Sequence, residues 1–272
     1  MIVQHNLTAM NSNRMLNLTT TSQAKSTEKL SSGYKINRAA DDAAGLAISE
    51  KMRRQIKGLT QASSNAQDGI SCVQTAEGAL AEVHDMLQRM NVLATQASND
   101  TMTSVDRGYL DSEVQALVSE IDRVASTTTF NEQCLLDGTF TAKNLQVGAE
   151  AGQFIGMSIA AMNASSIGID SVAVSGATNT NAQKAISMVK SALALVSKQR
   201  SDLGAVQNRL EHTIKNLDNV VENTTSAEAQ IRDTDMAKEM VAYSNSQILA
   251  QAGTSMLTQA NQANQNVLSL LQ

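Results

Sequence analysis

The sequence predicts a mainly α protein, an elongated coiled-coil helical bundle with a short β-hairpin region. Proline is absent from the 272 residues, so no position must lose a backbone donor or break a helix. Only 2% of the residues are aromatic, which suits a thin bundle built from Leu, Ile, Val, Ala and 13 Met better than a globular core. Apolar residues also recur at alternating steps of three and four, the spacing of one helical face.

The first half predicts three helices. A first helix is expected to stop at Ser32–Gly33, because glycine readily adopts the left-handed conformation of a helix end. Asp41–Asp42 and Asp106 are placed to begin the next two, since a carboxylate can accept bonds from free N–H groups there. The polar stretch 98–104 predicts the loop between these two helices. Their apolar stripes are Val73, Ala76, Leu80, Val83, Leu87, Met90, Ala94 and Ala97, then Leu110, Val114, Leu117, Ile121 and Val124.

The second half begins with a glycine-rich region, residues 135–176, in which the segments 144–147 and 153–159 predict short strands of a hairpin. About 40 residues are too few for an independent domain, so this region is expected to rest against the helices. Residues 186–221 then carry one apolar face and predict a helix of about 40 residues, roughly 60 Å long.

Both ends of the chain lack charge. Residues 240–272 contain no Asp, Glu, Lys or Arg but ten Asn and Gln, and residues 2–13 have no formal charge apart from a possible protonated His5. A disordered polar tail is one alternative, but apolar residues at helical spacing argue against it: Leu249, Ala252, Met256, Ala260, Ala263, Val267 and Leu270. A membrane anchor would have to bury ten amides. Because buried charges are costly whereas amides can bond locally, we expect helices that other copies of the chain surround, with heterologous contacts that give filaments. The residues expected to carry self-assembly are Leu7, Leu249, Met256, Val267 and Leu270.

Composition argues against several other functions. The charge is −5, so a nucleic-acid partner is not expected. No stretch is long and apolar enough for a membrane span, and the first residues do not predict a cleaved signal peptide. His5, His84 and His212 form no zinc pattern and no phosphate-binding glycine loop appears, so we expect no catalytic site, metal or cofactor. Cys72 and Cys134 are expected to be free thiols.

Several motifs resemble those of the bacterial flagellin family. In the N-terminal half these are Lys29–Asn37 (KLSSGYKIN), Asp41–Ile48 (DDAAGLAI), Asn65–Ser71 (NAQDGIS) and Gln74–Leu80 (QTAEGAL), and in the C-terminal half Leu203–His212 (LGAVQNRLEH) and Ile231–Met236 (IRDTDM). The resemblance covers about residues 1–135 and 180–272. The segment between is similar to the short connector of minimal flagellins, without large outer domains.

The resemblance implies the structural subunit of the flagellar filament, exported through the flagellar type III apparatus to the outside of the cell. It implies that the N- and C-terminal helices pair as an inner, filament-core domain of residues 1–40 and 231–272. Residues 41–180 would form an outer bundle with the hairpin region, and residues 181–230 its return helix. Implied partners are other copies of the chain, an export chaperone at the C-terminal helix, and the filament cap and hook-filament junction proteins.

The resemblance also implies a vertebrate partner, the Toll-like receptor that detects flagellin. The matching positions are Arg89 and Leu93 in the pattern Gln-Arg-(x)3-Leu-Ala, and Glu113 upstream of the Glu-Ile-Asp-Arg run. From the residues alone, Arg89 and Glu113 are solvated helix charges and Leu93 extends an apolar face.

The chain departs from the family pattern at four positions. Asn264 stands where the family often has proline, Gln272 where it often ends in a basic residue, and the two cysteines are unusual for an exported subunit. Two other readings stay open from the sequence. A coiled-coil regulatory module would fit the heptad-like helices, and the hook-filament junction protein shares terminal patterns with flagellin. Charge-free ends argue against the first, and the short middle against the second.

Overall fold

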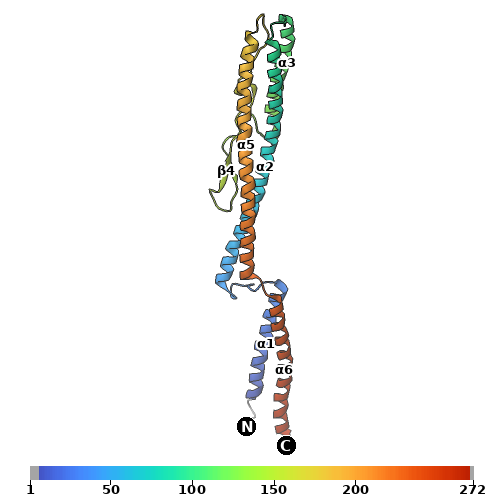
Figure 1. Ribbon diagram of the computed structural model, residues 1–272. Coiled ribbons are helices and arrows are strands. Elements are labelled where there is room, and N and C mark those ends of the chain that lie inside the picture. Colours follow the sequence, from blue (N-terminus) through green and yellow to red (C-terminus); the bar gives the residue numbers. More distant parts are fainter. Residues whose placement is uncertain (1–5, 270–272) are drawn as a thin grey trace. The chain divides into compact units, whose positions relative to one another are not determined.

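The computed structural model describes residues 6–269, and side chains up to residue 263 (Figure 1). This part of the chain is mainly α with two small antiparallel hairpins, as predicted. The elements are α1 (Leu7–Ser32), α2 (Ala43–Ala97), α3 (Ser104–Thr127), β1 (Thr129–Phe130), β2 (Gln133–Cys134), β3 (Lys143–Gln146), β4 (Phe154–Met157), α4 (Ala164–Ile167), α5 (Thr180–Arg232) and α6 (Met236–Ser269). None of the described helices is long and apolar enough to span a bilayer.

Backbone contacts divide the chain into two units. Residues 1–56 and 222–272 form one, which contains α1 and α6, and residues 57–221 form the other. The long helices α2 and α5 contribute to both.

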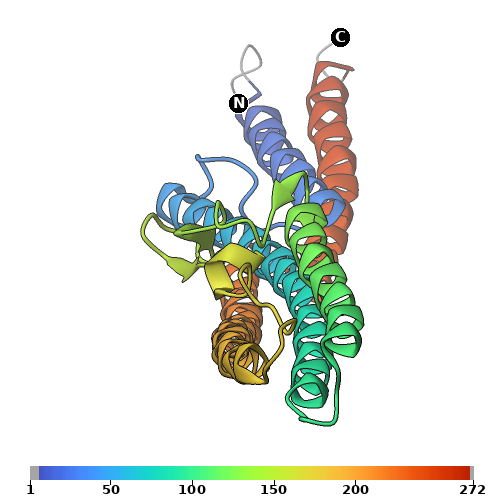
Figure 2. The same cartoon turned by 90° about the horizontal axis from the view of Figure 1, so that it is seen from above.

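The apolar stripes form the core of the unit made by residues 57–221, in which α2, α3 and α5 lie side by side (Figures 1 and 2). Every residue of the predicted α2 stripe is at most 1% exposed. Val114 and Ile121 of α3 and Val189, Val196 and Leu203 of α5 are equally buried. Helical spacing thus located the core of this unit correctly, because each of these helices presents one apolar face to its neighbours.

Local capping groups set the helix ends. Gly33 ends α1 with a φ of 76° and donates its N–H to Lys29 O at 2.8 Å. Asp42 Oδ1 accepts from Gly45 N at 2.9 Å at the start of α2, as expected. The prediction for α3 needs a correction: Thr103 is the N-cap, and Asp106 is the third helical residue, whose carboxylate accepts from Thr103 N in a capping box.

The β3–β4 hairpin was predicted, whereas β1–β2 was not. β3 pairs with β4 from Lys143 opposite Met157 to Gln146 opposite Phe154. The strands β1 and β2 have only two residues each, too few for an alternating pattern to appear in the sequence. The two residues that join them, 131 and 132, both have positive φ, 48° and 63°, as the two central residues of a type I′ hairpin turn require.

Two glycines of α2 let the β3–β4 hairpin lie against this helix. A Cβ at Gly58 would come within 2.9 Å of Ala149 Cβ, and one at Gly69 within 2.5 Å of Leu145 Cδ1. The two positions are 11 residues apart, close to three helical turns, and therefore lie on one side of α2. The hairpin region thus rests on the helices, as its small size requires.

Side chains of α3 and α5 form hydrogen bonds with backbone groups of the segments between the helices. Asp111 Oδ1 accepts from Val174 N at 2.7 Å, and Asp122 Oδ1 accepts from Ala164 N at 2.7 Å. Gln199, buried on α5, donates to Ser158 O at 3.3 Å. These bonds satisfy backbone groups that have no partner within a helix or strand.

Candidate functional site

The two terminal helices pair through side chains that are mostly small or polar. One residue every three or four positions on each helix is turned toward the other and is at least half-buried, the repeat of a coiled-coil seam. The α1–α6 seam consists of Ala9, Ser12, Leu16, Thr19, Gln23, Ser26 and Leu30 on α1 and Glu239, Tyr243, Ser246, Ala250, Gly253, Leu257 and Ala260 on α6.

Direct contacts fix the register of this pair. Asn6 Nδ2 donates to Ala260 O at 3.0 Å at one end, and Lys29 Nζ lies 3.6 Å from Glu239 Oε2 at the other. Between them, a Cβ added at Gly253 would lie 3.3 Å from Leu16 Cδ1, so the helices approach closely there. The pair is therefore antiparallel and places the beginning of α1 beside the end of α6.

Leu16, Leu30 and Leu257 lie in the seam, but most large apolar residues of the same helices point away from it. Of the predicted assembly residues, Leu7 is 67% exposed, Leu249 60% and Met256 61%. The side chain of Val267 and the whole of Leu270 lie outside the described residues. Further exposed members of this outward apolar surface are Met10, Met15 and Leu18 on α1 and Met236, Met240, Val241 and Ile248 on α6.

The outward apolar surface extends around α6. Leu249 and Met256 are seven residues apart and share one side of the helix, while Val241 and Ile248, also seven apart, share a second side. Leu249 follows Ile248 directly and is thus turned by about 100° from it. Apolar groups on several sides of a helix are typical of one enclosed by other protein. Helical spacing in the sequence singled out Leu249 and Met256, but these two residues do not belong to the α1–α6 seam.

A short antiparallel bridge closes the far end of the terminal pair, where α1 ends and α5 passes into α6. Lys35 N donates to Arg232 O at 2.7 Å, and Thr234 N donates to Gly33 O at 2.9 Å. The Arg232 guanidinium lies 4.5 Å from the centre of the Tyr34 ring and 3.3 Å from Glu50 Oε1. Backbone hydrogen bonds thereby join the chain after α1 to the chain between α5 and α6.

The receptor-binding prediction involves a different place, on α2 and α3. Arg89 Nε donates to Glu113 Oε1 at 2.8 Å, and the two side chains are about half exposed. Leu93 is only 1% exposed and belongs to the core of the bundle. The structure thus brings Arg89 and Glu113 together at the surface and places Leu93 beneath them. Its neighbour Val92 is exposed instead. This exposure is expected, because Val92 does not lie on the apolar stripe of α2.

The described residues offer no arrangement for catalysis. No group of three or more His, Cys, Asp or Glu side chains among them could hold a metal ion. Cys72 is buried and Cys134 half-buried, and the Asp41 and Asp42 carboxylates accept separate backbone bonds. What remains distinctive is a pair of helices most of whose large apolar side chains face outward.

Comparison with known proteins gives one family. Residues 3–141 match the family model described as the bacterial flagellin N-terminal helical region, and residues 186–271 the one described as the bacterial flagellin C-terminal helical region. The chain is 55% identical over 271 residues to the flagellin of Halalkalibacterium halodurans and 50% identical over 286 residues to the flagellar filament 31.3 kDa core protein of Treponema maltophilum, with both chains covered completely in each case. The crystal structure of Bacillus cereus flagellin matches with a TM-score of 0.50 at 29% identity, over 57% of this chain and 88% of that one.

Proposed function

Because the chain belongs to the bacterial flagellin family, it is a structural protein and not an enzyme, and we propose that it polymerises through its two ends into the flagellar filament. In this proposal α1 and α6 are enclosed by neighbouring copies. The working location is the filament outside the cell.

One observation carries this proposal: the terminal pair uses mainly small and polar residues internally and turns most of its large apolar residues outward. An isolated helix pair normally does the opposite, since burying large apolar groups is the main source of stability. From Met240 on, the outward apolar surface of α6 is also free of charged side chains, because no Asp, Glu, Lys or Arg follows Glu239. Enclosure by other copies would bury the part of this surface on α6 from Met240 on without burying a charged side chain.

The assignment of layers follows from the same surface. Residues 1–40 and 231–272 would form the inner, filament-core domain, while residues 41–180 and the return helix 181–230 would form the outer bundle. An export chaperone at α6 would cover the same apolar side chains before export. The filament cap and the hook-filament junction proteins would contact the ends of the polymer.

A matched pair of isosteric substitutions tests the assembly surface. Gln251→Glu places one charge on the exposed side of α6, and Gln183→Glu places the same charge on an exposed position of α5. Burying an unpaired charge costs several kcal/mol, so Gln251→Glu should raise the critical concentration for polymerisation about 100-fold or more, equivalent to about 2.7 kcal/mol. Sedimentation and electron microscopy measure it.

The control should polymerise like the unmodified chain, and both variants should keep its helicity and melting temperature as monomers. Filaments of Gln251→Glu at the unmodified critical concentration would contradict the enclosure of α6.

We further propose that the patch of Arg89, Leu93 and Glu113 binds the Toll-like receptor that detects flagellin. Arg89 and Glu113 would supply the exposed atoms, and Leu93 would support them from the core. The half-exposed ion pair supports this, because exposed charges joined across two helices form a fixed polar surface at little cost in stability.

Binding of the monomer to the receptor ectodomain tests this second proposal. Arg89→Ala should weaken binding about tenfold, the usual loss of at least 1 kcal/mol when an interface arginine is removed. Arg123→Ala is the matched control, since Arg123 is an equally exposed arginine of α3, paired with Glu120. Equal affinity of the two variants would refute the patch.

A further inference from the structure

The chain has only six aromatic residues, all of them within the described part, and they fall into distinct environments. Tyr34 and Tyr243 are half-buried. Phe130 and Phe140 line a pocket, whereas Tyr109 is 73% and Phe154 52% exposed. Exposing a large ring is unfavourable, so an exposed ring and an open ring-lined pocket on the same unit suggest a match between copies.

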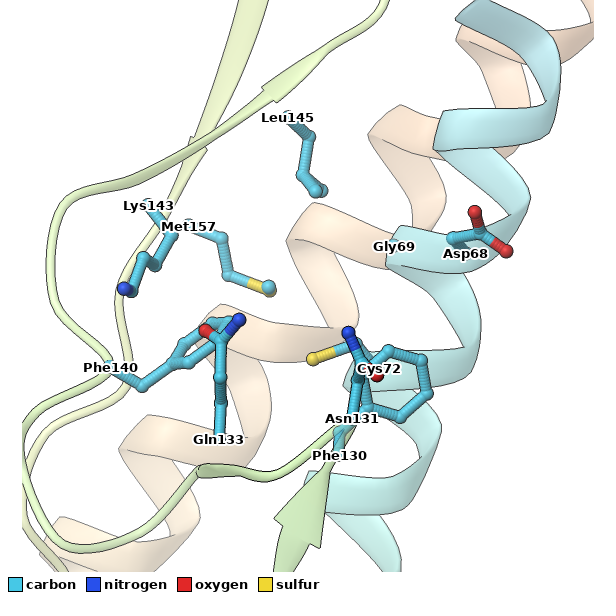
Figure 3. Close-up of a pocket in the computed structure, with 10 residues that line it drawn as sticks. All are labelled: Asp68, Gly69, Cys72, Phe130, Asn131, Gln133, Phe140, Lys143, Leu145 and Met157. Atoms are coloured by element: carbon cyan, nitrogen blue, oxygen red, sulfur yellow. The ribbon is translucent and has the colours of Figure 1, made fainter. Parts of the chain in front are cut away.

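The pocket lies between α2 and the two hairpins (Figure 3) and has a volume of about 210 Å³. A cavity of about 150 Å³ with an apolar lining can bind benzene, so this one accepts a substituted ring. Its apolar wall consists of Cys72, Phe130, Phe140, Leu145 and Met157.

The thiol of Cys72 makes the floor of the pocket neutral. The side chain is 4% exposed, and burial raises the pKa of the thiol, so it stays protonated. The Cys72 sulfur points into the pocket in Figure 3, as does the Met157 thioether. The Cys72 thiol is free and makes no hydrogen bond within the described residues. Both sulfur groups make favourable contacts with aromatic rings.

A positive charge lies at the mouth. Lys143 Nζ is 5.6 Å from the centre of the Phe140 ring, and no ion pair of Lys143 occurs within the described residues. Asp68 also lines the pocket, but its carboxylate points away from the other lining side chains in Figure 3. Tyr109 has a complementary neighbour, since Asp106 lies one turn before it on α3. Asp106 Oδ2 accepts both hydrogen bonds from Thr103, so Oδ1 is left for a cation.

We propose that Tyr109 of one copy inserts into this pocket of the next copy, with its Asp106 beside the Lys143 there. The inference rests on the proposed polymerisation and adds a contact away from the terminal helices. Ring and pocket are different surfaces of the unit, so the contact is heterologous and can repeat without closing. Phe154 is a less suitable ring, because its own strand β4 also carries Met157 of the pocket wall. If two copies each inserted Phe154 into the pocket of the other, their hairpins would meet face to face and form a closed pair.

The size of the contact explains where it forms. A buried tyrosine contributes about 150–250 Å², whereas a specific complex needs about 1,200 Å² or more. The contact is therefore too small to hold a dimer and forms only where the terminal helices already hold copies together.

A single tryptophan tests the proposal, because the chain has none of its own. In Tyr109→Trp the fluorescence of the monomer should be that of an exposed indole and be quenched by acrylamide. In filaments the emission should shift to shorter wavelength, and quenching should fall several-fold. Phe154→Trp is the matched control and should stay quenched in both states.

Filling the pocket gives the second arm. With Cys72→Leu added to Tyr109→Trp, the shift in filaments should disappear, while the melting temperature of the monomer verifies that the bundle is folded. An indole that stays quenched in filaments, or that is protected even with the pocket filled, overturns the proposal.

Polymerisation itself gives a readout that needs no tryptophan. Tyr109→Ala should raise the critical concentration and Phe154→Ala should not, and equal values would count against the contact. If the unmodified chain forms no filaments at all, the proposed function fails before this contact is reached, so the two failures are distinguishable.

Discussion

Arg107 is the charged side chain most deeply buried in the bundle, at 2% exposure. Its guanidinium donates to Ala97 O at 2.9 Å, to Asn99 O at 3.2 Å and to Ala177 O at 3.1 Å. One residue of α3 thus binds the last turn of α2, the α2–α3 loop and the segment before α5. The carbonyls of Ala97 and Ala177 take hydrogen bonds from this guanidinium, whereas Asn99 O also accepts from Met102 N at 3.2 Å.

Replacing Arg107 should therefore be costly. Arg107→Met keeps much of the apolar stem but removes the side-chain donor of Ala97 O and Ala177 O and one of the two donors of Asn99 O, so we expect a loss of about 3 kcal/mol in the free energy of unfolding. Urea unfolding measures it as a lower midpoint with unchanged slope. Arg123→Met on the same helix removes only an exposed pair with Glu120 and should cost less than about 1 kcal/mol. Similar midpoints for the two variants would show that the buried bonds contribute little.

Leu93 shows what a motif can and cannot predict at the level of single residues. The pattern places Arg89 and Leu93 about one turn apart on α2, and the structure pairs Arg89 with Glu113 across the helices. Burial of Leu93 follows from its place three residues after Met90, on the apolar stripe. Partners from separate helices cannot be read from spacing within one helix, so the ion pair itself was not predictable.

The contact between α2 and the β3–β4 hairpin makes a prediction at the level of elements. Gly58→Ala would place a methyl group 3.3 Å from Ala149 Cα and 2.9 Å from its Cβ, whereas nothing lies within 4 Å of a Cβ at Gly78. Gly78→Ala should stabilise the chain by about 0.5–1 kcal/mol through helix propensity. Gly58→Ala should lose that gain and be destabilising by about 1 kcal/mol or more.

Thermal unfolding compares these two variants directly, since both change glycine to alanine inside one helix. Equal melting temperatures would mean that the hairpin does not press on α2 at Gly58. Chemical shifts of residues 143–157 would then be unchanged as well.

The elements differ in how well the sequence predicts them. Long periodic stripes predicted α2, α3 and α5, although α5 extends from Thr180 to Arg232, beyond the expected 186–221, because its polar flanks contain no proline to stop it. The stripe through Leu249 and Met256 predicted a helix but not its facing, since the α1–α6 seam consists mainly of small residues that periodicity of large apolar groups does not detect. The β1–β2 hairpin depends on turn geometry at residues 131–132, for which the sequence has no glycine signal.

At the scale of the whole chain, the two units differ in the apolar burial that holds them. The bundle of residues 57–221 contains almost all fully buried apolar side chains, whereas the terminal pair buries few among the described residues. Local opening is easiest where few apolar contacts hold an element. We therefore expect amides of 7–32 and 236–263 to exchange with solvent much faster than those of 73–97 in the dilute monomer.

Hydrogen exchange followed by mass spectrometry measures this difference, and filaments should remove it by protecting the terminal helices. Strong protection of residues 236–263 in the dilute monomer would mean that the pair is stable without neighbours, against the proposed enclosure.

The bond between Asn6 and Ala260 has a practical consequence for anyone who wishes to label the protein. Because the first helix starts where the last one approaches its end, a label attached at Asn6 and one attached near Ala260 would occupy the same neighbourhood. Exchanging one of these two positions for the other would bring no relief. The exposed turn at Ala151–Gly152 is the better insertion point, because its glycine has a φ of 86° and a Cβ added there would meet no atom within 4 Å.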